Sequence, residues 1–82
     1  MTLELYKQVA LTRDLPENNL YRGDVAVLVD LIEHPSDGEQ GAILEVFNAI
    51  GESIDVVIVP ISLITDLRAD HIPSVRLLEK TV

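Results

Sequence analysis

Residues 21–29 join a turn directly to a strand pattern, and they read Tyr21-Arg22-Gly23-Asp24-Val25-Ala26-Val27-Leu28-Val29. Glycine provides the sharp entry into the strand, because it adopts positive φ without steric cost. Apolar residues then recur with period two as far as Ile32, which predicts a strand over 25–32. Both faces of this strand are apolar near its centre. We therefore expect a central strand whose alternating valines fill the interior, while Leu28 lies on an outer face that another segment covers.

Two segments before this strand complete the first half of the fold. Residues 7–12 alternate apolar and polar, with Val9 and Leu11 on one side, which predicts a short half-buried strand. Residues 13–24 are rich in turn formers and predict a loop. We expect this loop to be ordered if Leu15, Leu20 and Tyr21 fold back onto the core.

The second half of the chain predicts a hairpin and a closing strand. Residues 33–41 form a polar turn with two glycines and one proline, expected to be a mobile hairpin tip. Residues 42–48 fit a strand or a helical stripe, and the β-branched run over 53–59 favours two strands around a turn at 49–52. Pro60 ends the second of these, residues 61–63 form one tight turn, and residues 65–68 form a short last strand.

Taken together, these segments predict an all-β fold. We expect a small five-stranded barrel at residues 1–68, with a one-turn 3-10 helix before the last strand, and an apolar C-terminal extension at residues 69–82. The Gly23-Asp24 step into a valine-rich strand resembles the SH3-like barrels of ribosomal and transcription-factor type. The extension has no sustained period, and it packs either on its own barrel over Leu28 or, as we favour, on a neighbouring subunit.

A closer resemblance covers most of residues 7–68. It rests on Val9-Ala10-Leu11-Thr12-Arg13-Asp14-Leu15-Pro16, on Gly23-Asp24-Val25-Ala26, on Leu44-Glu45-Val46-Phe47-Asn48-Ala49 and on residues 54–60. On these residues the chain resembles the family of small bacterial proteins termed domain of unknown function 4926. The resemblance implies the barrel fold and a binding role, since some members look like small antitoxin-like partners of another protein. It implies no catalytic residue.

The charge and the apolar runs of the chain argue against nucleic-acid and membrane partners. The 82 residues carry a formal net charge of −8, and residues 1–59 hold eleven acidic against three basic side chains. An acidic body repels nucleic acid, so we expect no DNA or RNA partner. The longest apolar run, Val25 to Val29, is far shorter than the roughly 20 residues that cross a bilayer. No secretory signal is visible at the start, so we expect a cytoplasmic protein without a membrane partner.

Few residues offer catalytic or metal-binding chemistry. The chain has no cysteine, and its four glycines are isolated, so no disulfide or phosphate-binding loop is expected. Two groups of side chains could in principle hold a cation, His34 with Asp37 and Glu39, and Asp14 with Glu17 and Asp24; neither has the required spacing or rigidity. The serines lack a positioned base, since only His34 and His71 are present. We therefore expect no metal, no cofactor and no enzyme activity.

The remaining candidate is an interaction surface. Apolar residues that we expect to be exposed on a single chain are Leu28, Ile43, Phe47, Ile72, Val75, Leu77 and Leu78. Coverage by a second copy would make the protein a homo-oligomer. The sequence favours a non-enzymatic interaction module whose acidic face binds a protein partner, such as a basic toxin-like protein, by electrostatic complementarity. The alternative is a structural subunit that assembles with its own copies.

Overall fold

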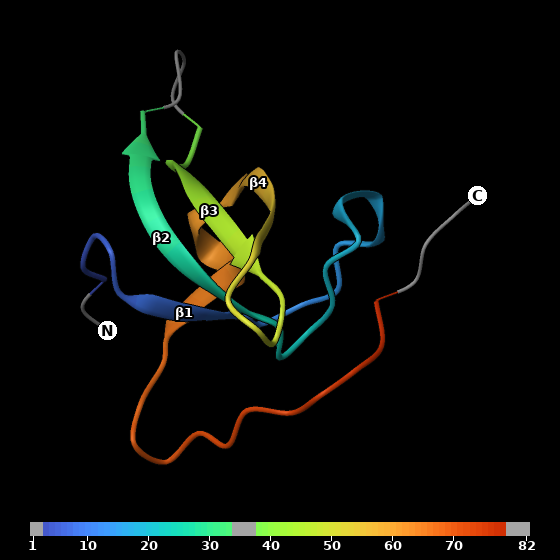
Figure 1. Cartoon of the computed structure of the whole chain (residues 1–82). Coiled ribbons are helices and arrows are strands. Elements are labelled where there is room, and N and C mark those ends of the chain that lie inside the picture. Colours follow the sequence, from blue (N-terminus) through green and yellow to red (C-terminus); the bar gives the residue numbers. More distant parts are fainter. Residues whose placement is uncertain (1–2, 34–37, 79–82) are drawn as a thin grey trace.

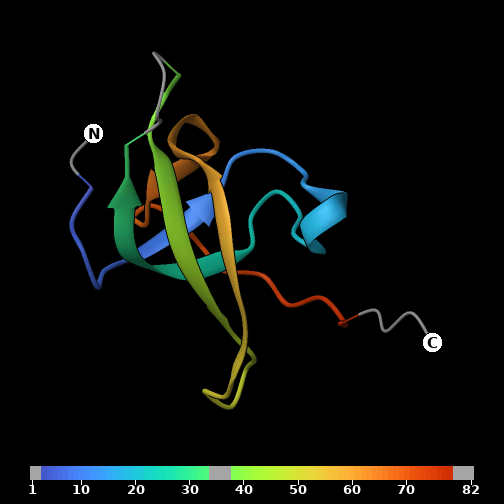
Figure 2. The same cartoon turned by 90° about the horizontal axis from the view of Figure 1, so that it is seen from above.

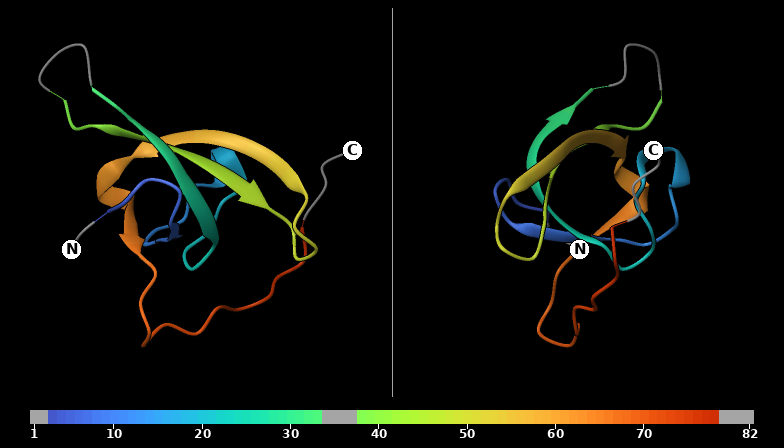
Figure 3. Two further views of the ribbon diagram at one scale, coloured as in Figure 1. Left: turned by 60° about the vertical axis from the view of Figure 1, so that its left-hand side comes forward. Right: turned by 45° about the vertical axis from the view of Figure 1, so that its right-hand side comes forward.

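Five antiparallel strands form one strongly curled sheet in the order β4-β3-β2-β1-β5 (Figure 1). The structure is a computed structural model and describes residues 3–33 and 38–78. The elements are β1 (Gln8–Leu11), η1 (Pro16–Asn18), β2 (Val25–Ile32), β3 (Gly41–Phe47), β4 (Ser53–Pro60), η2 (Ile61–Leu63) and β5 (Ile64–Asp66). β2 and β3 curve across the molecule so that the two ends of the sheet approach each other through η2 (Figures 2 and 3). The prediction of an all-β, five-stranded, barrel-like fold is confirmed.

The strand boundaries agree with the periodicity to within a few residues. β2, β3, β4 and the turn η2 lie where the sequence predicts them, while β5 begins one residue early and ends at Asp66. The short 3-10 turn η1 is an element that the sequence pattern does not predict. The turn expected over 33–41 lies partly on residues 34–37, which are outside the described residues.

The core is made by one face of each strand. In antiparallel pairs, residues directly opposite each other share a face. The pairing sets Val9 opposite Ala26, Leu28 opposite Leu44, and Ala42 opposite Val59. All of these side chains are buried, together with Leu11, Leu20, Val57 and Ile64.

The predicted orientation of β2 is wrong. Leu28, expected on the outer face, is 0% exposed, while Val25, Val27 and Val29 are only half-buried. The residues opposite β2 on the neighbouring strands explain why Leu28, and not Val27, points to the core. Val27 lies between Gln8 of β1 and Glu45 of β3, which are polar, so its face turns outward. The alternation of β2 is compatible with either orientation because both of its faces are apolar.

Of the three side chains of the 13–24 loop predicted to fold back onto the core, Leu15 and Leu20 do so, while Tyr21 is half-buried and is not among the core residues. Leu15 and Leu20 pair through two backbone hydrogen bonds of 2.7 and 3.1 Å, Leu20 is buried, and Leu15 packs against the core. Asn19 takes the left-handed conformation (φ 55°) at the end of η1, and its N–H donates to Pro16 O. Gly23, at φ 91°, turns the chain into β2.

Residues 69–78 leave β5 and run along the outside of the barrel toward the 13–24 loop (Figure 1). They contain no strand or helix among the described residues, which extend to Leu78. Their apolar side chains do not cover Leu28, which is enclosed by the sheet itself. We find no helix in the described residues that is long and apolar enough to cross a membrane.

Candidate functional site

The predicted surface residues of β3 lie beside a larger apolar face on β4. Ile43 is half-buried and Phe47 is 38% exposed, both on the outer side of the sheet that also carries Glu45. Val56 lies opposite Glu45, and Ile58 lies opposite Ile43. Val56 and Ile58 are 58% and 60% exposed. Sequence reasoning missed these two residues, although the continuous β-branched run over 56–59 is the signal that one of its apolar faces must point outward.

β4 is an edge strand of the sheet, and part of its edge is blocked. The backbone N–H of Val56 donates to the carboxylate of Asp55 at 2.8 Å, so this N–H is not available to another strand. A register shift between Val46 and Phe47 places one extra residue in β4, and Pro60 has no N–H to donate. Bulges, charges and prolines of this kind protect a sheet edge from pairing with other chains.

A shallow groove of about 470 Å³ adjoins one end of this face. The residues that line it include the apolar Ile32, Ile58 and Pro60 and the acidic Glu33 and Glu39. Gly41 keeps the groove open, since a Cβ there would lie 3.2 Å from Cγ2 of Ile58. The groove therefore combines apolar and acidic groups.

The predicted apolar residues of the C-terminal extension remain uncovered in the single chain. Ile72, Val75 and Leu77 are 92%, 90% and 87% exposed, and Leu78 is 48% exposed. The predicted packing of these side chains on their own barrel is therefore not what the structure shows for the first three. Exchange of the extension between subunits stays a prediction.

The extension instead contacts the barrel through Arg76. Its guanidinium Nε and Nη2 donate to the two carboxylate oxygens of Asp24 at 2.9 and 2.6 Å. Nη2 also donates to the carbonyl oxygen of Asn19 at 2.9 Å. The guanidinium carbon lies 4.7 Å from the centre of the Tyr21 ring. A planar bidentate pair with an aromatic face beside it is specific to arginine, because lysine offers neither the fork nor the plane.

Several other carboxylates of the barrel accept hydrogen bonds from uncharged groups. Asp14 accepts the Arg22 backbone N–H, Glu45 accepts the Ser53 hydroxyl, and Glu52 accepts the Asn48 amide. The described residues contain no buried charged side chain. Neutral donors fix these carboxylates in place without cancelling their charge, so the surface of the barrel stays strongly negative.

The candidate catalytic residues are not assembled into a catalytic group. The Ser53 hydroxyl donates to Glu45 at 2.6 Å, and Nδ1 of His71 accepts the Arg68 backbone N–H at 3.0 Å. Asp70 forms a salt bridge with Arg68 at 3.3 Å, and the Arg68 charge holds the pKa of Asp70 below its ordinary value. His34, Ser36 and Asp37 lie outside the described residues.

Two of the carboxylates considered for cation binding, those of Glu39 and Asp24, have other hydrogen-bond partners. Glu39 accepts the Ser62 backbone N–H at 2.8 Å, and this bond lowers the pKa of Glu39. Asp24 binds Arg76 and also accepts the Tyr21 backbone N–H at 2.9 Å. In the described part of the chain, no three histidine or acidic side chains form a group that could hold a metal ion.

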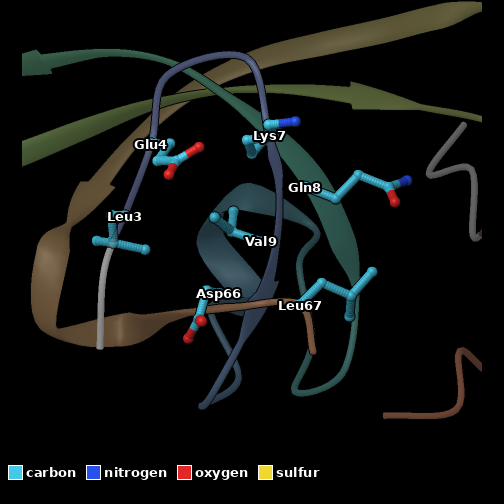
Figure 4. A pocket seen from close by; sticks show the side chains of 7 residues that line it. All are labelled: Leu3, Glu4, Lys7, Gln8, Val9, Asp66 and Leu67. Atoms are coloured by element: carbon cyan, nitrogen blue, oxygen red, sulfur yellow. The ribbon is translucent and has the colours of Figure 1, made fainter. Parts of the chain in front are cut away.

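A second cavity, of about 320 Å³, lies between the N-terminal turn, β1 and β5 (Figure 4). Glu4 and Lys7 lie toward one end of it and Asp66 toward the other, with the buried Val9 between them (Figure 4). The residues that line it in the described chain include no serine or histidine. The cavity thus has charged groups but, in its described lining, no serine with a histidine beside it.

No protein-family model, no curated protein and no solved structure matches this chain. The resemblance to domain of unknown function 4926 therefore stays a prediction.

Proposed function

We propose that this protein is a non-enzymatic interaction module whose acidic barrel surface binds a basic protein partner. The observation that carries the proposal is the bonding of the barrel carboxylates to neutral donors, which leaves their negative charge uncompensated. Such a surface attracts a basic partner over several ångströms and speeds its association. If the partner acts on nucleic acid, the carboxylates occupy the groove that would bind phosphates, and the module inhibits it in the manner of an antitoxin.

The partner is expected to be a protein and not a nucleic acid. Nucleic-acid binding draws its affinity from basic side chains that neutralise phosphates. The body of this chain has eleven acidic and three basic residues over 1–59, which opposes that mode of binding. The groove lined by Ile58 adds apolar contact area, and Glu33 and Glu39 also line it, a combination suited to the long side chains of lysine or arginine.

The test is recovery of partners on the tagged full-length protein at low and high salt, with a charge-neutralised variant beside the wild type. We choose Glu17→Gln, Glu45→Gln, Glu52→Gln and Asp55→Asn together, because the amide oxygen still accepts the local hydrogen bonds. We expect recovery of a basic protein that high salt releases, and about tenfold weaker binding by the variant, a change of about 1.4 kcal/mol.

The matched control neutralises two acids outside the acidic body, Asp66→Asn with Asp70→Asn. We expect it to bind the partner as the wild type does, with the same salt dependence. Equal binding by wild type and the four-site variant at every salt concentration would contradict the proposal.

A second candidate function is self-assembly through the outer face of β4. It is favoured by the contiguous exposure of Val56 and Ile58 on an edge strand. Light scattering after size-exclusion chromatography tests it, with Ile58→Lys as the disrupting variant. Ile50→Lys is the control, because Ile50 is 81% exposed in the β3–β4 turn. Assembly predicts an oligomer that only the first variant dissolves, and a monomeric wild type excludes it.

A further inference from the structure

The contacts of Arg76 define a site on the barrel with a specific chemistry. The site presents three groups: the carboxylate of Asp24, the carbonyl oxygen of Asn19 and the ring face of Tyr21. The carboxylate and carbonyl oxygens accept N–H groups in the plane of the guanidinium, and the ring contacts its face. One arginine side chain can therefore pair its N–H donors and positive charge with the oxygens while its flat face contacts the ring.

The barrel builds this site from residues 11–25, without help from the extension. Asp24 is held by a backbone pair, in which Leu11 N–H donates to Asp24 O at 2.9 Å and Gly23 N–H donates to Leu11 O at 2.8 Å. The Tyr21 N–H orients the Asp24 carboxylate. Asn19 is fixed by its hydrogen bond to Pro16 and precedes the buried Leu20. The acceptors are therefore preorganised for an arginine, which lowers the entropy cost of binding one.

Arg76 occupies the site as a tethered ligand would. It lies 52 residues from Asp24 in the sequence, and the side chains of Val75 and Leu77 on either side of it are 90% and 87% exposed. In the described residues, the hydrogen bonds between residues 72–78 and the barrel are those of Arg76. The described residues of the extension contribute none of the core residues, so we expect the core to stay covered when the extension leaves this place.

We propose that Asp24, Asn19 and Tyr21 form an arginine-binding site, which Arg76 fills in the free protein and an arginine in an extended segment of the basic partner fills in the complex. The choice of a protein partner rests on the proposed function. The partner's arginine displaces Arg76, which is freed with the rest of the extension. Because a tethered group has an effective concentration of about millimolar, Arg76 raises the threshold for binding and favours partners that engage the acidic surface at several points.

A peptide tests the site without the native partner. The labelled probe is Ile-Pro-Ser-Val-Arg-Leu-Leu, the sequence of residues 72–78, blocked at both ends, and its binding to the full chain is followed by fluorescence polarisation. We expect Arg76→Ala to bind the probe at least about tenfold more tightly than the wild type, because the tethered competitor is gone. A probe with lysine in place of arginine should not bind Arg76→Ala, since lysine cannot form the bidentate pair.

The matched variant is Asp24→Asn with Arg76→Ala. The asparagine amide oxygen still accepts the Tyr21 N–H, so the loop keeps its shape while the charge is lost. Loss of probe binding by this double variant, with an unchanged unfolding curve, supports the site. Equal binding of the probe by wild type and Arg76→Ala, no binding by either, or equal binding of the arginine and lysine probes would overturn it.

Three further outcomes distinguish a failure of the arginine-binding site from a failure of the proposed function. Probe binding with no basic protein recovered from the host would leave the site standing and remove the proposed function. A salt-released basic partner that binds Arg76→Ala no better than wild type would leave the function standing and overturn the displacement. A wild-type dimer that Arg76→Ala dissolves would place Arg76 in the site of a second copy, and would overturn the assignment to another protein.

Discussion

Among single residues, Leu28 differs most between prediction and structure, because the sequence pattern places it on the outer face and the structure places it in the core. It is 0% exposed and lies opposite Leu44, which is equally buried. A leucine in this position contributes to stability and cannot contact a partner. Its truncation leaves a cavity that the close-packed neighbours fill only in part.

Leu28→Ala is expected to lower the free energy of unfolding by about 2–5 kcal/mol, as buried leucine truncations do. Ile72→Ala, at a side chain that is 92% exposed, is expected to change it by less than about 0.5 kcal/mol. Urea denaturation of both variants measures the difference. Similar small losses from the two variants would show that Leu28 is not in the core.

Gly23 is the residue on which the entry into β2 depends. Its φ is 91°, and no atom lies within 4 Å of the position that a Cβ would take. A side chain would therefore meet conformational strain and no steric obstacle.

Gly23→Ala is expected to destabilise the fold by about 1–2 kcal/mol, the cost of positive φ for a residue with a Cβ. Gly23→Asn should cost less, since asparagine tolerates positive φ better than alanine does. Arg22→Ala serves as the control, because Arg22 uses its backbone N–H, and not its side chain, to bind Asp14. Equal losses from the two Gly23 variants, measured by urea denaturation, would contradict a conformational cause.

Among the elements, β2 shows that strand pairing, and not the period of apolar residues, decides which face of a strand is buried. The alternation of residues 25–32 locates the strand correctly, but its two faces are both apolar and the sequence offers no way to choose between them. The choice is made by neighbours, because Gln8 and Glu45 flank Val27 while Leu44 faces Leu28. Glu39 and Ser62 illustrate the same limit, since their hydrogen bond joins segments 23 residues apart.

The Glu39–Ser62 bond ties the start of β3 to η2 and gives a pH-dependent contribution to stability. The Ser62 backbone N–H and hydroxyl lower the pKa of Glu39 below its ordinary value of 4.5. The folded state therefore binds this proton more weakly than the unfolded state does. The contribution is fully present above pH 4.5 and is lost as the pH falls through the lowered pKa.

Glu39→Gln is expected to lower the unfolding temperature at neutral pH, and the difference from wild type should shrink in acid, below the lowered pKa of Glu39. Glu17→Gln is the control, because the Glu17 side chain is exposed on η1 and has no hydrogen bond to another element in the described chain. Thermal denaturation across this pH range measures both. A difference from wild type that grows toward low pH would contradict a lowered pKa of Glu39 in the folded state.

At the scale of the whole molecule, Arg76 supplies the hydrogen bonds that join residues 72–78 of the extension to the barrel in the described part of the chain. The core residues all lie between Val9 and Ile64. The extension reaches the barrel through the Arg76–Asp24 pair, whose side chains are 35% and 18% exposed. Pairs that solvent reaches contribute little to stability, because water screens the charges.

Deletion of residues 69–82 is expected to leave the barrel folded and to change its free energy of unfolding by less than about 1 kcal/mol, the value of a partly exposed ion pair. Arg76→Ala in the full chain should account for the whole of this change. Circular dichroism and urea denaturation of the two proteins make the comparison. An unfolded or strongly destabilised deletion variant would show that the extension is part of the folding unit.

Local sequence patterns predict the number and position of the strands, the loop over 13–24, the turn before the last strand and the negative charge of the barrel. These properties are local, since period two, turn residues and charge are read within a few positions. Tertiary structure alone decided that Leu28 points inward, that Val56 and Ile58 point outward, and that Arg76 meets Asp24. Each of these depends on contacts between residues distant in the chain, which strand pairing and sheet curvature fix and which no local pattern encodes.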